Sequence, residues 1–356
     1  MKKNNNAKKL VAILVSLVLL IIVGIFVVFH LSLKPISKAE DIVPFKVKEN
    51  VSAKTVLKDL KDANIIRNDT VAYYNCRIKR NADFKAGNFE VDRSMNLDEI
   101  VAYLSNNDNI IKNTITITFK EGEWLKEYAY KLAENTNLQA EEIIAYWNDP
   151  EVVKGYMEEY PFLTDEILNS ESRYYLEGYL FPNTYEFYRE TNLDAVTRTF
   201  LNETKRIYEK YLDDFKANAM SIHEIFTLAS IVQYEAADIE DMKNIASVFL
   251  NRLDINMPLQ SSVTVCYSMD IDRQNDDWRD CEYNPDYESP YNTYKYYGLT
   301  PGPILNPGED AILAVLEPAS TDYLYFMADV CHDGKVYYSK DYATHQSYIN
   351  KYINCY

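Results

Sequence analysis

The hydrophobic pattern begins with one long apolar run near the N-terminus. Positions 10–29 read LVAILVSLVLLIIVGIFVVF, and only Ser16 and Gly24 interrupt their apolar character. About 20 apolar residues in a helix cross the hydrocarbon core of a bilayer, whereas the apolar region of a cleaved signal peptide has about 7–15. Since no small-x-small cleavage motif follows directly, the run predicts a retained transmembrane helix at 10–29.

The residues on either side of this run predict its orientation. Positions 1–9 hold four lysines and no acidic residue, and positions 30–40 form a short linker. Lysines beside a transmembrane helix favour the cytoplasmic side of the membrane. We therefore expect a single-pass protein of the cell membrane, with positions 1–9 as a cytoplasmic tail and the folded part outside the cytoplasm.

Beyond the linker, the pattern has the period of a strand and then that of a helix. In the segment 41–63, Phe45 and Val47 alternate with lysines, and apolar residues then recur at helical spacing. A weakly similar segment follows at 117–134. The pattern predicts two copies of a strand–turn–helix unit, although two unrelated segments with the same periods would look alike.

Three short strand-like segments, 45–47, 88–91 and 115–119, predict one small sheet with helices packed on it. Asn96 and Glu99 have the spacing of a helix N-cap. We therefore expect a small α/β domain at 41–120. A larger mixed α/β domain follows at 121–356, which makes the fold class α+β with a single N-terminal transmembrane helix.

Within the larger domain, the segment 226–238 (FTLASIVQYEAAD) is mostly apolar but carries Gln233 and Glu235 near its end. Ser221 and Glu224 form a capping-box pattern that predicts the start of this helix. At about 100° per residue, Glu235 lies at the edge of the apolar stripe, and Gln233 points about 200° away from it. The two side chains are therefore expected in different surroundings.

A carboxylate at the border of an apolar face is partly desolvated, which favours its protonated form. Such a side chain is suited to donate a proton near neutral pH, so Glu235 is a candidate general acid. A glutamate that reaches solvent near a helix end, or that pairs with a basic residue, has the same pattern. Position alone leaves both interpretations open.

Composition excludes several classes of function. The chain has 356 residues, which suits two modest domains, and its net charge of −17 argues against binding to nucleic acid. It contains no G-x-S-x-G, H-E-x-x-H or phosphate-loop motif. We therefore expect neither a cofactor nor a metal ion.

The cysteines are unevenly distributed along the chain. Cys76 is alone in the first half, whereas Cys266, Cys281, Cys331 and Cys355 lie in the last third. Outside the cytoplasm, four such cysteines are expected to form two disulfides, and three pairings are possible. The spacing does not choose among them.

Several segments stand out when they are taken together and in order: FKAG at 84–87, LEGYLFPNTY at 176–185, LASIVQYEA at 228–236, ASVFLNRLDINMPLQS at 246–261, YNTYKYYGLTPGPILNPG at 291–308 and YLYFMAD at 323–329. With the N-terminal helix, they span nearly the whole chain and resemble the endolytic murein transglycosylases (MltG or YceG-like proteins). The resemblance implies a LysM-like domain, followed by a catalytic domain that acts on the glycan strands of peptidoglycan.

The resemblance also implies roles for individual residues. The catalytic glutamate of the family falls on Glu235, whose carboxyl group would cleave the bond between N-acetylmuramic acid and N-acetylglucosamine and form 1,6-anhydro ends. Gln260, Asn292 and Tyr294 match motif positions and are candidates for sugar binding. Glu177 is a further candidate near the site, or else a structural partner of the tyrosine-rich turn.

Some positions depart from the family pattern. Gln233 stands where glutamate is common, Asn183 stands where the family has Asp, and Ser262 and Val263 replace the usual Asp-Pro. A non-catalytic, wall-binding scaffold is therefore the alternative function. For either function the family implies peptidoglycan strands, and also penicillin-binding proteins, as partners.

Overall fold

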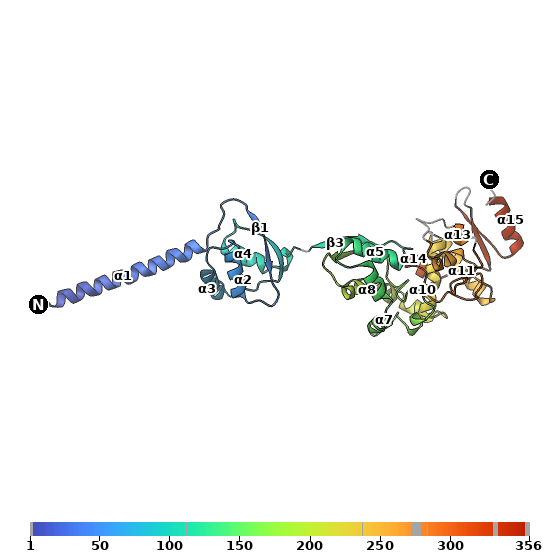
Figure 1. The fold of residues 1–356 in the computed structure, drawn as a ribbon, viewed down its shortest axis with the longest axis horizontal. Coiled ribbons are helices and arrows are strands. Elements are labelled where there is room, and N and C mark those ends of the chain that lie inside the picture. Colours follow the sequence, from blue (N-terminus) through green and yellow to red (C-terminus); the bar gives the residue numbers. More distant parts are fainter. Residues whose placement is uncertain are drawn as a thin grey trace. The chain divides into compact units, whose positions relative to one another are not determined.

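The computed structural model describes residues 3–111, 113–236, 238–271, 279–282, 284–329 and 334–352. The chain divides into two compact units, Met1–Asn113 and Thr114–Tyr356 (Figure 1). Each unit has its own hydrophobic core of buried side chains. The fold is mixed α/β, as predicted.

The first helix, α1 (Lys3–Ser32), contains the predicted apolar run. Within it, the 19 residues Leu14–Ser32 are long and apolar enough to cross a membrane, and their side chains are not covered by the rest of the protein. This helix is therefore a candidate membrane span, which is consistent with a single-pass anchor.

The first unit is a strand–helix–helix–strand arrangement followed by one more helix. Its elements are β1 (Ile42–Val47), α2 (Ala53–Asp62), α3 (Asp69–Lys79), β2 (Gly87–Asp92), α4 (Leu97–Leu104) and the short η1 (Asn107–Asn109). β1 and β2 pair antiparallel, with Phe45 opposite Phe89. The predicted cap of α4 is confirmed, because Asn96 and Glu99 form a complete capping box.

The predicted third strand does not belong to this sheet. β3 (Thr114–Thr118) pairs antiparallel with β4 (Thr184–Tyr188) in the second unit, and the hydroxyls of Thr118 and Thr184 are 2.9 Å apart. The three-stranded sheet expected in the first domain is therefore wrong, and the division between units falls after Asn113. Alternation of apolar and polar residues indicates a strand but not the strand with which it pairs. Here the paired residues Thr118 and Thr184 are 66 positions apart.

The second unit opens with the same order of elements as the first. After β3 come α5 (Leu125–Asn135) and α6 (Ala140–Trp147), and the returning strand is β4. Between α6 and β4 the chain inserts α7 (Pro150–Met157) and η2 (Asp165–Leu168). The predicted repeat is thus present as β1–α2–α3 and β3–α5–α6, each closed by an antiparallel strand.

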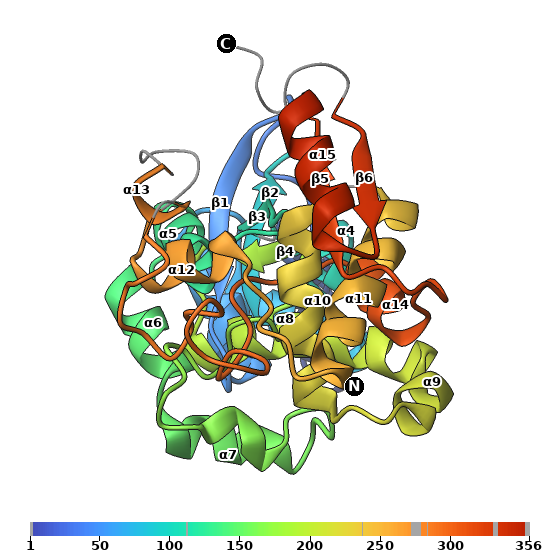
Figure 2. The same cartoon turned by 90° about the vertical axis from the view of Figure 1, so that its right-hand side faces the viewer.

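The rest of the second unit is built around one buried helix, α10 (Ile222–Glu235), which packs against α11, α12 and α14 (Figure 2). A hairpin of β5 and β6 packs against α15 at the end of the chain. The remaining bounds are α8 (Leu193–Lys210), α9 (Leu212–Ala217), α11 (Ile239–Asp254), α12 (Ser262–Ser268), α13 (Arg279–Glu282), α14 (Glu309–Leu316), β5 (Tyr325–Ala328), β6 (Val336–Ser339) and α15 (Tyr342–Tyr352).

One disulfide joins α12 to α13, between Cys266 and Cys281. It selects one of the pairings that the cysteine pattern left open, while Cys331 and Cys355 lie outside the described residues. Cys76 is a buried free thiol in α3, and burial raises its pKa.

Candidate active site

Helix α10 forms because its sequence supplies a local start signal and an apolar body. The Ser221 Oγ accepts from the Glu224 N–H at 3.2 Å, and the Glu224 carboxylate accepts from the Ser221 N–H at 2.7 Å, so the predicted capping box is confirmed. The helix is buried from Ile225 to Val232 without interruption. It is therefore enclosed on all sides, rather than along one stripe as its pattern predicts, because α11, α12 and α14 all pack against it.

Glu235 is the last residue of this helix, and it is half-buried at the border that its position predicts. Its Oε1 accepts a hydrogen bond of 2.7 Å from the Oγ of Ser261. Ser261 is only 3% exposed, so the hydroxyl reaches the carboxylate from the protein interior. The end of α10 thus presents a carboxyl group that is held on one side by a buried donor.

Arg252 of α11 is the nearby positive charge, and it interacts electrostatically with Glu235. Its guanidinium is buried and donates to the carbonyl oxygens of Leu324 at 2.7 Å and Leu259 at 2.6 Å. Burial lowers the pKa of Arg252, while Tyr325, Tyr294 and Glu235 oppose that shift. The charge is therefore held in place by backbone carbonyls close to the carboxyl group.

Gln233 points away from Glu235, as the helical period predicts, and it has a different hydrogen-bond partner. Its Oε1 accepts a hydrogen bond of 2.8 Å from the N–H of Gly308, the residue that precedes α14. Gln233 therefore joins two helices, and Glu235 faces Ser261.

The backbone beside Glu235 is held by Thr293. The N–H of Gln260 donates to the Thr293 carbonyl at 3.0 Å, and the N–H of Ser261 donates to the Thr293 Oγ1 at 3.0 Å. Gln260 has a φ of 50°, a left-handed conformation that is uncommon for a residue other than glycine. Its side chain is exposed.

The other two predicted sugar-binding residues of this region differ in accessibility. Asn292 is fully buried, and its side chain donates to the carbonyls of Pro285 at 2.8 Å and Tyr287 at 2.7 Å while accepting from the Tyr294 N–H at 2.9 Å. Asn292 therefore organises the loop from within. Tyr294 is half-buried and interacts electrostatically with Arg252, which places it beside the candidate site.

Glu177 is fully buried, and its side chain lies against the start of α5. Its Oε1 accepts from the N–H of Leu125 at 2.7 Å, and its Oε2 accepts from the hydroxyl of Tyr267 at 3.2 Å. Desolvation raises the pKa of Glu177 to about 8, although both hydrogen bonds and the charge of Arg173 oppose the rise. In this arrangement Glu177 supports the first amide of α5 and the hydroxyl of Tyr267.

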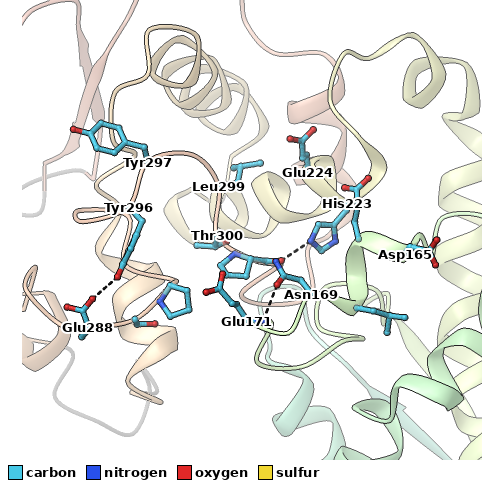
Figure 3. Close-up of a pocket in the computed structure, with 15 residues that line it drawn as sticks. Asp165, Asn169, Glu171, His223, Glu224, Glu288, Tyr296, Tyr297, Leu299 and Thr300 are labelled. Carbon is cyan, nitrogen blue, oxygen red and sulfur yellow. Dashed lines mark hydrogen bonds between the residues drawn. The ribbon is translucent and has the colours of Figure 1, made fainter.

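A cavity of about 860 Å³ lies at the opposite end of α10, beside His223 and Glu224 (Figure 3). α10 has 14 residues, so its two ends are about 20 Å apart. The Nε2 of His223 lies 3.0 Å from the Pro301 carbonyl oxygen, and its Nδ1 lies 2.8 Å from the Tyr179 hydroxyl. Glu235 is not among the lining residues of this cavity, which is separate from the candidate active site.

Sequence reasoning missed Ser261, Thr293 and Arg252 as parts of the site. All three fall inside the quoted motifs, so the motifs themselves were the available signal. The contact between Ser261 and Glu235 joins residues 26 positions apart, and no helical or strand period links them.

Helix α10 thus places Glu235 next to the hydroxyl of Ser261 and near the guanidinium of Arg252 and the side chain of Tyr294. Known proteins share this combination of fold and motifs. The chain matches the YceG-like family over residues 45–351 and belongs to that family. The resemblance noted from the motifs is thereby confirmed.

Relatives of known name agree with this assignment. The chain is 34% identical over 338 residues to the endolytic murein transglycosylase of Bacillus subtilis, covering 94% of this chain and 92% of that protein. It is 30% identical over 335 residues to the endolytic murein transglycosylase of Streptococcus pneumoniae, covering 91% of this chain and 61% of the longer relative. A 2.6 Å crystal structure of the yceG-like protein lmo1499 from Listeria monocytogenes is similar with a TM-score of 0.60 and 32% identity, over 87% of this chain and 99% of that one.

Proposed function

We propose that this protein is a membrane-anchored lytic transglycosylase that cleaves peptidoglycan glycan strands internally, with Glu235 as its catalytic residue. The observation that carries the proposal is the half-buried Glu235 carboxyl group, held by Ser261 at the end of α10. The names of the relatives support the reaction class, because both are endolytic murein transglycosylases.

One carboxyl group is sufficient for the proposed chemistry. Protonated Glu235 donates its proton to the oxygen between N-acetylmuramic acid and N-acetylglucosamine, and the bond from this oxygen to C1 breaks. The carboxylate then accepts the proton of the muramoyl 6-hydroxyl, whose oxygen bonds to C1. The products are a free 4-hydroxyl and a 1,6-anhydro end, and no water is consumed. Ordinary hydrolysis instead uses a pair of carboxyl groups on either side of the bond.

Gln260 and Tyr294 are the proposed contacts to the sugar. The Gln260 side chain is exposed one residue before Ser261, and an amide can donate to and accept from sugar hydroxyls. Tyr294 offers an aromatic face and a hydroxyl near Arg252. Asn292, which is fully buried, accepts from the Tyr294 N–H and so supports Tyr294 from inside the protein. Glu177, which is also fully buried, binds Leu125 and Tyr267 instead.

The remaining parts of the proposal concern the location of the enzyme. The candidate span Leu14–Ser32 anchors the protein, and the lysines that precede it favour a cytoplasmic N-terminus with the catalytic unit outside. We propose that the first unit is LysM-like and binds glycan, which its β1–α2–α3–β2 order supports. Penicillin-binding proteins that synthesise the strands are the proposed partners, so that cleavage ends strand elongation.

The test is product analysis after incubation of the purified protein with polymeric peptidoglycan. The wild type is expected to release fragments with anhydro-muramoyl ends, and Glu235→Gln is expected to lose at least ~100-fold in rate because it carries no proton to transfer. Glu240→Gln is the matched control, since Glu240 is exposed in the first turn of α11 and undergoes the same chemical change. An E235Q variant with the wild-type rate would exclude this mechanism.

Mass spectrometry also separates the alternatives. Reducing ends in place of anhydro ends would identify a hydrolase. Strands that are bound but left intact by the wild type would identify the non-catalytic scaffold, which the Ser262-Val263 replacement of Asp-Pro suggests. The structure shows that α12 nevertheless begins at this Ser-Val pair.

A further inference from the structure

We infer that Ser261 is a positioning residue that sets the orientation and the proton affinity of the Glu235 carboxyl group, and that Thr293 holds Ser261 in place. The inference rests on the proposed function of Glu235 and adds a residue to it. It begins from the 2.7 Å hydrogen bond between the Ser261 Oγ and the Glu235 Oε1.

Ser261 does not use its side chain where a serine in its position normally does. Ser261 is the N-cap residue of α12, and serine is a preferred N-cap because its hydroxyl accepts from an amide of the first turn. Here the side chain forms no such bond with its own helix. The hydroxyl is directed to Glu235 instead, so its position serves the carboxyl group rather than the local helix.

Ser261 is also held in place through its backbone. Its N–H donates to the Thr293 Oγ1 at 3.0 Å, and its carbonyl oxygen accepts from the Thr264 hydroxyl at 2.9 Å. Thr264 and Thr293 are themselves fully or almost fully buried, and their hydroxyls are 3.0 Å apart. A side chain that is buried and fixed through both backbone groups loses little conformational entropy when it binds the carboxylate.

The backbone just before Ser261 is constrained as well. Gln260 adopts a left-handed conformation with φ of 50°, which costs energy for a residue with a Cβ. The N–H of Gln260 donates to the Thr293 carbonyl, so Thr293 contacts both residues of this turn. The turn directs the two side chains in opposite directions: Gln260 is exposed, and Ser261 is buried.

These contacts have a consequence for proton transfer. A hydroxyl that donates to Oε1 stabilises the carboxylate, and in the protonated acid it favours Oε1 as the carbonyl oxygen. The proton that Glu235 transfers is therefore carried on Oε2. Among the described residues, the titratable groups that interact electrostatically with Arg252 include Tyr294, Tyr325 and His345, and the positive charge of Arg252 also favours the ionised carboxylate of Glu235.

The experiment compares Ser261→Ala, Ser261→Thr and the neighbouring control Ser262→Ala in the full-length protein, with polymeric peptidoglycan as the substrate. For S261A we expect kcat to fall about tenfold with KM nearly unchanged, because one hydrogen bond to a charged group is lost. We also expect the high-pH limb of the rate profile to move up by about one pH unit, since the carboxylate loses a stabilising donor. S261T keeps the hydroxyl and is expected to restore both properties, and S262A is expected to match the wild type.

A second variant, Thr293→Val, tests the proposed support and covers the case in which S261A does not fold. It removes the hydroxyl that accepts from Ser261 while keeping the shape of the side chain, and we expect a smaller loss of kcat with the same direction of pH shift. Melting temperatures are measured for every variant. A general loss of stability without a pH shift would overturn the inference.

The remaining outcomes of these measurements are also decisive. Wild-type kcat and pH profile in S261A would overturn the inference, as would equal impairment of S261A and S261T, which would indicate packing alone. If E235Q is inactive while S261A is normal, only the role of Ser261 is overturned. If E235Q keeps its activity, the proposed function and the role of Ser261 are both wrong.

Discussion

The two units of this protein use the same order of strand, helix, helix and strand, yet they start their first helices differently. In the first unit, α2 is capped by its own neighbour, because Ser52 accepts from the N–H of Thr55. In the second unit, α5 has no side-chain cap hydrogen bond from Trp124, and the first amide of the helix, at Leu125, is bound by Glu177, 52 positions later.

This difference shows how one local pattern is used in two contexts. The first unit closes around a core formed by residues of its own β1–β2 sheet and helices. The corresponding strands and helices of the second unit share one core with α8, α10, α11 and α14. The cap of α2 is local to its own helix, whereas the carboxyl group of Glu177 joins the start of α5 to a segment 52 positions later in the same unit.

The largest effect is expected when the long-range cap is removed. Glu177→Ala leaves the Leu125 N–H and the Tyr267 hydroxyl without their buried partner and opens a cavity, which should destabilise the second unit by about 4 kcal/mol. Hydrogen exchange followed by mass spectrometry reports each unit separately. We expect faster exchange in α5 and unchanged exchange in α2, and equal acceleration in both helices would contradict the contrast.

An effect of comparable size is expected from a rise in pH. The pKa of Glu177 is raised to about 8 in the folded protein, above its ordinary value of 4.5. Ionisation therefore costs more in the folded than in the unfolded state. The stability contributed by neutral Glu177 is full below pH 4.5 and is lost as the pH rises through about 8, with a total loss of several kcal/mol, comparable with that in Glu177→Ala.

The variant Glu177→Gln isolates this contribution, because it stays neutral at every pH. Urea unfolding of the second unit at pH 5 and pH 9 should differ for the wild type and be nearly equal for E177Q. If E177Q shows the same pH dependence as the wild type, another group is responsible for it.

The disulfide between Cys266 and Cys281 is expected to stabilise the second unit to a similar or slightly smaller degree. The two cysteines are 15 positions apart, and closing a loop of about this length is worth up to ~3 kcal/mol. The double variant Cys266→Ala/Cys281→Ala should therefore lower the urea midpoint of the second unit. The first unit has no part in this bond, and a matching shift in its midpoint would be unexpected.

The smallest effect belongs to the local cap of the first unit. Ser52→Ala removes the acceptor for the Thr55 N–H and should cost about 1 kcal/mol, confined to α2. Ser52→Gly is the informative companion, since glycine at an N-cap costs only a few tenths of a kcal/mol. Peptidoglycan cleavage is expected to be unchanged in both variants, and a change in the rate would show that the two units are coupled.

Features that depend on near neighbours in the chain were predictable. The apolar run of α1, the capping boxes at Asn96 and Ser221, and the repeated strand–helix pattern all follow from spacing over a few residues. The opposite directions of Gln233 and Glu235 follow from the helical period, and the structure gives them separate partners. Such features are local because a helix relates residues three and four apart in a fixed geometry.

Features that depend on distant residues required the folded chain. These are the pairing of β3 with β4, the bond between Cys266 and Cys281, the burial of Glu177 and the hydroxyl of Ser261 against Glu235. The motifs marked Glu235 but did not reveal what holds it. That contact forms only when α10 and the start of α12 pack together, since a hydrogen bond depends on the positions of two atoms in space and not on their separation along the chain.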